Sequence, residues 1–506
     1  MTNSEATAPS VSHRTATGAG WIIAWRMATR NIGLVSTLIL VRLLQPSDFG
    51  LVALATGIIS SVDALSAIGV QDALVRAPDL DRELYDTGFG LSLLRGILTA
   101  LLIALIAWPA ARFFGDARLI VVMLALSAGT VISAFENIGI IDFRRDVAFR
   151  KEFDMQLWSR VVSAAMTIGV AVVWRSYWAL IAGILTYRLV RLFQSYVMSP
   201  YRPRVTFRAW RRIIGFSLWT WAGMILSQIQ ERSDSIIIGR LLGTMQVGVF
   251  AVGVELGSLP ATEVVEPMGR ALFPGFASLH NASSGVASLF LGAVGIGFML
   301  VLPAGVGISM VADPMVRLCL GEQWLAAVPV VQIMAVGAIV AVFIHAAANL
   351  INAIGRPRVT FFTGLASTLV KVSALLLLVP RVGLPGAAAA LAGSSLVNVV
   401  VLLWYALPRA AVSPSQLLAC MIRPAIATLA MVGVLWQLGM AWTPAAAAFG
   451  FAGDAAARSL TGALCYALVL FGTWFAMGRP DGAERLALTM AKAVWLRLCR
   501  PRKAAW

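Results

Sequence analysis

Long runs of apolar residues, separated by short polar stretches, extend along almost the whole chain. Each run is close to the ~20 residues that an α-helix needs to cross a lipid bilayer. Because the runs are continuous, they are typical of helices in lipid. The pattern predicts an all-α polytopic membrane protein with about fourteen transmembrane helices. The predicted helices span residues 21–44, 48–70, 87–111, 118–141, 154–174, 177–199, 213–239, 245–269, 286–311, 325–353, 358–380, 384–407, 417–440 and 459–478.

Composition supports the membrane assignment. The chain has 506 residues, of which 59% are hydrophobic and 13% are charged. A soluble domain carries ~25% charged residues, so a water-exposed surface of ordinary polarity is excluded. Most basic residues outside the predicted helices fall on the side that holds the N-terminus, which places both termini in the cytoplasm. The net charge of +16 then faces anionic lipid headgroups, and no nucleic-acid partner is expected.

A tight turn between the first two helices occurs twice in the sequence. Gln45-Pro46 ends the first helix because proline lacks an N–H, and Ser47 or Asp48 is expected to cap the second. The second copy lies 198 residues later, where Gly243 ends a helix and Thr244 can cap the next. The same offset relates Arg42 to Arg240, Arg14 to Arg212, Trp21 to Trp219 and Ser60 to Ser258. These matches indicate a duplicated unit.

The duplication predicts the domain organisation. Its copies begin six helices apart, and because six is even they run the same way through the membrane, as parallel repeats do. We therefore expect two six-helix lobes followed by two further helices. The predicted parts are a disordered cytoplasmic N-terminus (1–20), an N-lobe (21–200), a C-lobe (210–407), helices 13 and 14 (417–478) and a basic cytoplasmic tail (479–506).

Sequence signals for catalysis are absent. The chain has no G-x-x-x-x-G-K-[ST] motif for nucleotide binding and no H-E-x-x-H motif for zinc. Its four cysteines have neither metal-ligand nor disulfide spacing. We therefore expect a transporter and not an enzyme, with no catalytic residue, metal or cofactor.

Charged residues inside the apolar runs are the candidate functional residues. Each costs ~2.5–3.5 kcal/mol at mid-bilayer, so each is expected to face a cavity or a partner. Basic residues of the N-lobe are candidates for binding an anionic substrate: Arg26, Arg30, Arg95 and Arg188. Carboxylates of the C-lobe are candidates for coupling to a proton or Na⁺: Glu231, Asp234, Glu255 and Glu263. The alternative is that these charges form buried ion pairs between helices.

Three segments carry a resemblance to a known family: Arg42-Leu43-Leu44-Gln45-Pro46-Ser47-Asp48-Phe49-Gly50-Leu51, Gly69-Val70-Gln71-Asp72-Ala73-Leu74-Val75-Arg76 and Asp234-Ser235-Ile236-Ile237-Ile238-Gly239-Arg240-Leu241-Leu242-Gly243. On these segments the chain resembles the polysaccharide transporter (Wzx- and WzxC-like) family of the multidrug/oligosaccharidyl-lipid/polysaccharide (MOP) flippase superfamily.

The resemblance implies two lobes facing a central cavity in the bacterial inner membrane. It implies a flippase that moves undecaprenyl-diphosphate-linked oligosaccharide across that membrane by ion-coupled alternating access, for exopolysaccharide, capsule or lipopolysaccharide O-antigen synthesis. The implied partners are membrane lipids, a polysaccharide polymerase and the export machinery. Related lipid II flippases hold the lipid tail in a groove at two extra helices, so helices 13 and 14 are candidates for that role.

Two alternatives stay open at this point. A drug or cation antiporter of the same superfamily would need an acidic N-lobe cavity, whereas this N-lobe is expected to be basic apart from Asp63 and Glu136. A membrane polysaccharide polymerase would usually carry catalytic side chains on a long periplasmic loop. The longest candidate loop, 441–458, has Asp454 as its one acid.

Overall fold

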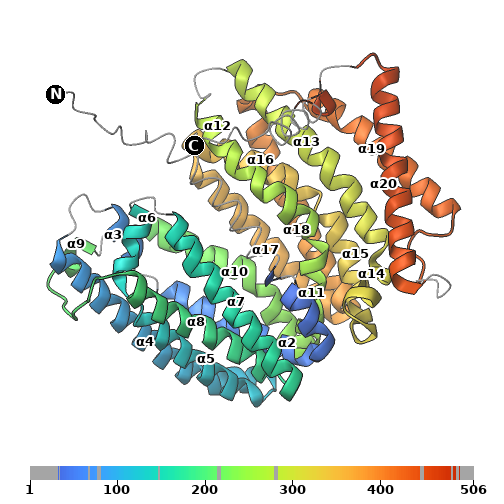
Figure 1. The fold of residues 1–506 in the computed structure, drawn as a ribbon. Helices are drawn as coiled ribbons and strands as arrows, with labels where there is room; N and C mark the ends of the chain where they lie inside the picture. Colours follow the sequence, from blue (N-terminus) through green and yellow to red (C-terminus); the bar gives the residue numbers. More distant parts are fainter. Residues whose placement is uncertain are drawn as a thin grey trace, which may run out of the picture. The chain divides into compact units, whose positions relative to one another are not determined.

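The computed structural model describes residues 32–33, 35–66, 69–76, 81–145, 149–213, 218–278, 283–444, 450–479, 482–485 and 489. All regular elements within these ranges are helices (Figure 1). A short helix at 35–43 comes first. In the N-terminal half follow α2 (Pro46–Leu65), α3 (Val70–Arg76), α4 (Arg82–Phe114), α5 (Arg118–Ala134), α6 (Ile141–Arg145), α7 (Phe149–Trp174), α8 (Trp178–Met198), α9 (Trp210–Ile213) and α10 (Leu218–Leu242).

The remaining helices include long continuous helices and shorter helices that follow one another across a bend. They are α11 (Thr244–Gly257), a π-helical turn (Ala261–Val265), α12 (Glu266–Ser278), α13 (Ser283–Met310), α14 (Ala312–Cys319), α15 (Val328–Gly337), α16 (Val340–Ala353), α17 (Pro357–Val382), α18 (Leu384–Arg409), α19 (Pro414–Gln437) and α20 (Gly450–Ala476). Two 3₁₀ turns lie at Ile138–Ile140 and Glu322–Ala327.

Each predicted apolar range includes a helix among the described residues. In the first range, 21–44, this helix lies near the end, at 35–43. Eight described helices are long and apolar enough to cross a membrane, and up to ten do so if each bent pair counts as one span. Helices α8 and α10 are outside that set, and both carry charged residues. The chain is thus a multi-pass helical membrane protein, while the count of fourteen spans stays a prediction.

Two compact units make up the chain, Met1–Gly248 and Val249–Trp506. In the first unit α4 packs against α5, α7 against α8, and α2 against both α5 and α10. The predicted C-lobe, residues 210–407, includes α10. Helix α10 is grouped with the first unit because its main partner is α2. The lobe boundaries themselves stay a prediction.

The duplicated turns differ in detail from the predicted caps. Helix α2 starts at Pro46, and Asp48 accepts a hydrogen bond from the backbone N–H of Gln45 at 3.1 Å. Proline suits this first helical position because its missing N–H would have no helical partner. In the second copy Gly243 has φ +89° between α10 and α11. There the prediction for Thr244 was wrong, because its hydroxyl donates to Asp116 at 3.3 Å and does not cap α11.

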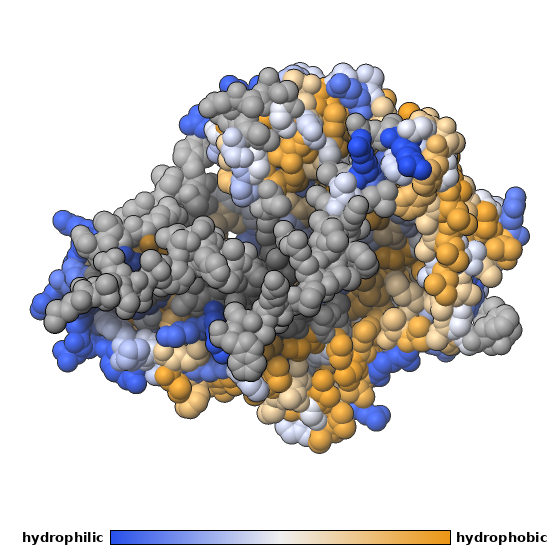
Figure 2. All heavy atoms as spheres, turned by 45° about the horizontal axis from the view of Figure 1, so that its top comes forward, coloured by the Kyte–Doolittle hydropathy of each residue, from blue (hydrophilic) through white to orange (hydrophobic). Residues whose placement is uncertain are grey.

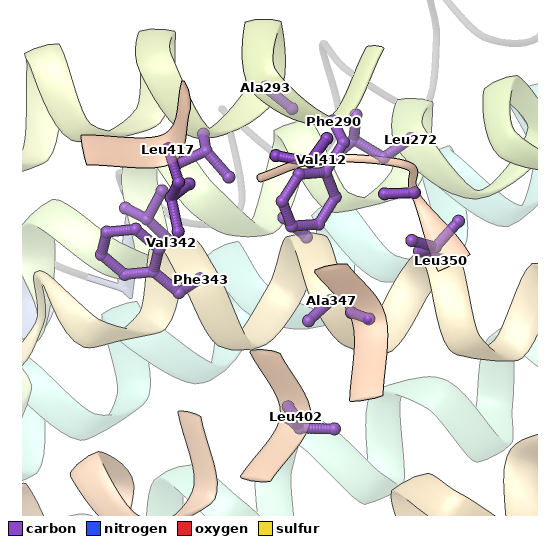
Figure 3. Close-up of a cluster of buried hydrophobic side chains, with 14 of the residues drawn as sticks. Leu272, Phe290, Ala293, Val342, Phe343, Ala347, Leu350, Leu402, Val412 and Leu417 are labelled. Atoms are coloured by element: carbon purple, nitrogen blue, oxygen red, sulfur yellow. The ribbon is translucent and has the colours of Figure 1, made fainter. Parts of the chain in front are cut away.

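The second unit is built around one large apolar cluster. Its side chains come from α12, α13, α16, α18 and α19 and interdigitate (Figure 3). Phe290, Ala347 and Leu402 are at most 1% exposed within it. Because five helices contribute, this cluster holds the helix ends of the unit together as one body.

The outer faces of the helices expose large hydrophobic side chains, unlike the polar surface of a soluble protein. Leu105 of α4, Trp404 of α18 and Leu468 of α20 are each more than 70% exposed. Figure 2 shows broad hydrophobic areas of this kind over the helix surfaces. Leucine and tryptophan side chains at such positions are stable in hydrocarbon and costly in water, which agrees with a membrane-embedded protein.

Candidate functional site

A polar cavity of about 450 Å³ lies inside the first unit. It is enclosed by the end of α2, the first residues of α3, the middle of α4, the end of α5 and the second half of α8. Its lining residues are Asp63, Gly69, Val70, Gln71, Ser92, Arg95, Gly96, Thr130, Ser133, Ala134, Glu136, Tyr187, Arg188 and Arg191. Small-molecule sites commonly fall between ~300 and ~1,000 Å³, so the cavity can hold part of a substrate.

Two of the three arginines in the cavity face acidic partners. Arg191 donates from Nε to Glu136 Oε1 at 2.6 Å. Arg95 Nη2 lies 3.7 Å from Asp63 Oδ1, which is an ion pair but too long for a hydrogen bond. Asp63 Oδ1 is buried and has no hydrogen-bond partner among the described residues.

Arg188 is the third cation. Its Nη1 donates to the hydroxyl of Thr130 at 3.1 Å, which is its one hydrogen bond to the described part of the chain. Thr130 is neutral, so this bond gives Arg188 no direct salt bridge to a carboxylate of the described residues. With three cations and two anions, the described lining has a positive excess. Such an excess attracts anions, and the low-dielectric surroundings strengthen the attraction.

Small residues on α4 and α5 make room for these side chains. A Cβ on Gly129 would lie 3.1 Å from Arg188 Cδ, tighter than ordinary contact, so glycine lets the arginine stem lie against α5. A Cβ on Gly96 would lie 2.3 Å from the Cβ of Ala134, so α4 and α5 approach closely beside the cavity. Close approach through small residues is a common packing mode of membrane helices.

The four arginines predicted to bind substrate fall into two groups. Arg95 and Arg188 line the same cavity although 93 sequence positions separate them. Arg26 and Arg30 lie outside the described residues. Whether any of the four binds substrate stays a prediction.

The predicted coupling carboxylates do not line this cavity. Glu231 is exposed and Asp234 half-buried on α10, in the first unit. Glu255 of α11 and Glu263 of the π-helical turn are exposed in the second unit. Their role in coupling stays a prediction.

Sequence reasoning missed how the remaining cavity residues cooperate. Arg191 lies three residues after Arg188, on the same helix face, and that spacing could have marked both. Tyr187 gave no signal of its own, and Gln71 is marked only as part of the family-like segment 69–76. Arg160, across from this helix on α7, places its guanidinium 5.5 Å from the Tyr187 ring centre. In the described ranges no group of three or more metal-ligating side chains could hold a metal ion.

Comparison with known proteins settles the family. The family model described as "Polysaccharide biosynthesis protein" matches residues 39–329, more than half of the chain. The chain belongs to this polysaccharide biosynthesis family. The match begins just before the Pro46 turn and includes the cavity residues of the first unit.

Relatives of this family member have names from polysaccharide biosynthesis. It is similar to the succinoglycan biosynthesis transport protein ExoT of Rhizobium meliloti, with 25% identity over 65% of this chain and 67% of the relative. It is also similar to the lipopolysaccharide biosynthesis protein WzxC of Escherichia coli, with 21% identity over 73% of this chain and 76% of that protein.

Solved structures share the fold. The lipid II flippase MurJ in an inward closed conformation superposes with a TM-score of 0.72 at 12% identity, covering 90% of this chain and 100% of MurJ. An inward-facing multidrug resistance MATE family transporter of the MOP superfamily superposes with a TM-score of 0.58 at 18% identity. The match covers 76% of this chain and 95% of the transporter. At these identities the likeness shows the fold alone.

Proposed function

We propose that this protein is a flippase for undecaprenyl-diphosphate-linked oligosaccharide repeat units, acting in the bacterial inner membrane. The units would be turned from the cytoplasmic to the periplasmic leaflet for surface polysaccharide synthesis. The proposal includes cytoplasmic termini, alternating access and coupling of transport to an ion.

The observation that carries this proposal is the cationic cavity of the first unit. Three guanidinium groups around one cavity are costly in a membrane protein, and such groups are retained where they bind or conduct something. Guanidinium groups match phosphate oxygens in charge and geometry. A diphosphate headgroup would therefore supply the anionic partner that Arg188 lacks among the described residues.

Other support comes from the fold and the relatives. ExoT is named a transport protein and MurJ a lipid II flippase. Two of the three cavity arginines have acidic partners. The third adds a positive charge, so the described lining is basic overall. That charge favours an anionic substrate over the cationic drugs of an antiporter.

The test is a gene deletion complemented with variants. Deletion should cause lipid-linked repeat units to accumulate on the cytoplasmic leaflet and surface polysaccharide to disappear. Arg188→Ala should restore less than about a tenth of the polysaccharide, since a charged hydrogen bond contributes ~1.5–3 kcal/mol. Arg208→Ala, at an exposed position in the segment before α9, is the control and should restore wild-type amounts.

Other outcomes would reject the proposal. Normal export of repeat units with shortened polymers would indicate a polymerase. Changed drug resistance with normal polysaccharide would indicate an antiporter. Each variant's amount in the membrane is measured by immunoblot, so that loss of protein is not mistaken for loss of transport.

A further inference from the structure

Two ionised groups of the cavity have unfilled hydrogen-bonding capacity. Arg188 donates only to Thr130 among the described residues. Asp63 makes no hydrogen bond through Oδ1, although its side chain is 36% exposed. Because Oδ1 itself is buried, that exposure belongs to the other atoms of the side chain. The acceptor that Asp63 offers to the cavity is therefore its other carboxylate oxygen, Oδ2, while Arg188 offers donors.

The uncharged residues of the lining indicate which class of ligand fits the cavity. Gln71, Ser92 and Ser133 present an amide and two hydroxyls, and Tyr187 adds an aromatic ring. Ser133 already donates to the Gly129 carbonyl at 3.2 Å. A hydrocarbon chain would offer no hydrogen-bond partner to Gln71 and Ser92, which is unfavourable. A ligand with several hydroxyl groups would satisfy them, because hydroxyls both donate to carboxylates and accept from amides.

The cavity therefore has the chemistry for a sugar that carries an anionic group. Resting on the proposed function and deepening it, we propose that this cavity binds the sugar next to the anionic group of the substrate. Asp63 accepts hydrogen bonds from the sugar hydroxyls, and Arg188 donates to the anion. About 450 Å³ accommodates one sugar with its charged group, while the rest of the oligosaccharide lies outside.

The anion has two chemical sources. It is either the phosphate that links the first sugar to the lipid or a carboxylate on the sugar itself. Both would pair with a guanidinium in the same bidentate manner. The two sources are distinguished by comparing the binding of probes that carry a neutral or an acidic sugar on the same lipid diphosphate.

The experiment measures binding to the purified full-length protein in detergent by calorimetry. The probes are farnesyl diphosphate, and farnesyl diphosphate linked to one hexose (glucose, galactose or N-acetylglucosamine) or to glucuronic acid. The wild-type protein should bind at least one sugar-bearing probe about tenfold more tightly than farnesyl diphosphate, as expected for hydrogen bonds to a charged group. Asp63→Asn should reduce that advantage to less than about twofold, while farnesyl diphosphate should bind at least as tightly as to the wild type, because the variant removes a negative charge beside Arg95.

Arg188→Gln distinguishes the two anions. If Arg188 binds the linking phosphate, the variant weakens all probes by about tenfold. If it binds a sugar carboxylate, only the glucuronic acid probe is weakened. No change with any probe would overturn the assignment of Arg188.

Retention of the full sugar advantage in Asp63→Asn would overturn the assignment of Asp63. If that variant fails to fold, Gln71→Ala at an exposed position tests the same claim and should also lower the sugar advantage. A wild-type protein that binds farnesyl diphosphate with no sugar advantage would overturn the sugar subsite alone. The flippase proposal would then still stand on the cellular accumulation of lipid-linked units.

Discussion

Gly50 of α2 and the backbone of Gly248, in the part of α11 that belongs to the first unit, lie directly against each other. A Cβ on Gly50 would be 1.7 Å from Thr244 O and 2.8 Å from Gly248 N. A Cβ on Gly248 would be 2.0 Å from Pro46 O and 2.8 Å from Gly50 N. The two glycines, like Pro46 and Thr244, are related by the 198-residue repeat offset. The contact is therefore reciprocal, as expected if the two turns descend from one ancestral unit, although the duplication itself stays a prediction.

Enlarging either glycine should destabilise the first unit. Gly50→Ala and Gly248→Ala each force a methyl group into backbone atoms, and overpacking of this kind costs ~1–3 kcal/mol. The expected result is a lower thermal unfolding temperature in detergent for each variant. Gly57→Ala on the same helix is the control, because its Cβ would meet only Arg232 Cδ at 3.6 Å. Equal stability of the Gly50, Gly248 and Gly57 variants would contradict the close contact.

Removing one partner of the ion pair that lines the cavity should lower stability more than removing both partners. The side chains of Arg191 and Glu136 are 25% and 16% exposed and 2.6 Å apart. Either single change, Arg191→Met or Glu136→Gln, leaves one charge without its partner and should lower the unfolding free energy by about 3 kcal/mol. The double variant should be more stable than either single one.

The matched control is an exposed pair. Arg212 and Asp81 lie 2.8 Å apart with side chains 50% and 52% exposed. Surface pairs contribute little because water solvates both charges. Breaking this pair should change stability much less than breaking the cavity pair. Unfolding in denaturant, followed by tryptophan fluorescence, gives both comparisons, and equal losses would refute the difference.

One carboxylate of α4 accepts two hydrogen bonds from the segment after α8. Asp86, 7% exposed, accepts hydrogen bonds from the Tyr201 hydroxyl and from the Arg204 backbone N–H, each at 2.7 Å. Burial, together with the hydrogen bond to Asp86, raises the pKa of Tyr201. Its hydroxyl therefore stays protonated and donates throughout the physiological pH range.

Asp86→Ala should release this segment. Losing bonds to a charged acceptor costs ~1.5–3 kcal/mol, so trypsin should cleave after Arg204 about tenfold faster, since cleavage follows the population of the open form. Glu83→Ala, at an exposed position one turn earlier in the same helix, should leave the rate unchanged. An unchanged rate in Asp86→Ala would show that other contacts hold the segment.

A buried arginine joins the C-terminal helices. Arg458 of α20 is 2% exposed, pairs with Asp454 at 2.7 Å and donates to the carbonyl oxygens of Met440 and Thr443 at 3.0 Å. Lysine has one nitrogen and cannot reach all three acceptors. Arg458→Lys should therefore lower the unfolding free energy by about 3 kcal/mol. Arg381→Lys, at an exposed helix end, should have little effect; similar unfolding midpoints for the two variants would contradict this role.

The sequence by itself determined the helices and the family. A helix in lipid forms its backbone hydrogen bonds within one segment, so its length and position follow from a local apolar run. The duplicated turn at Pro46 and Thr244 is likewise local, and its short motif was enough to indicate the family. The sequence also singled out Arg95 and Arg188, because a charge in an apolar run is conspicuous.

Only the tertiary structure decided which charges meet. Arg191 pairs with Glu136, 55 residues away along the chain, while Arg188 finds the neutral Thr130. Which of two arginines on α8 is neutralised depends on how that helix is rotated against α5. Helix rotation is set by many small packing contacts, such as that of Gly129 with Leu185 and Arg188. Composition and periodicity do not contain that information, so the uncompensated charge of the cavity emerged only from the packed helices.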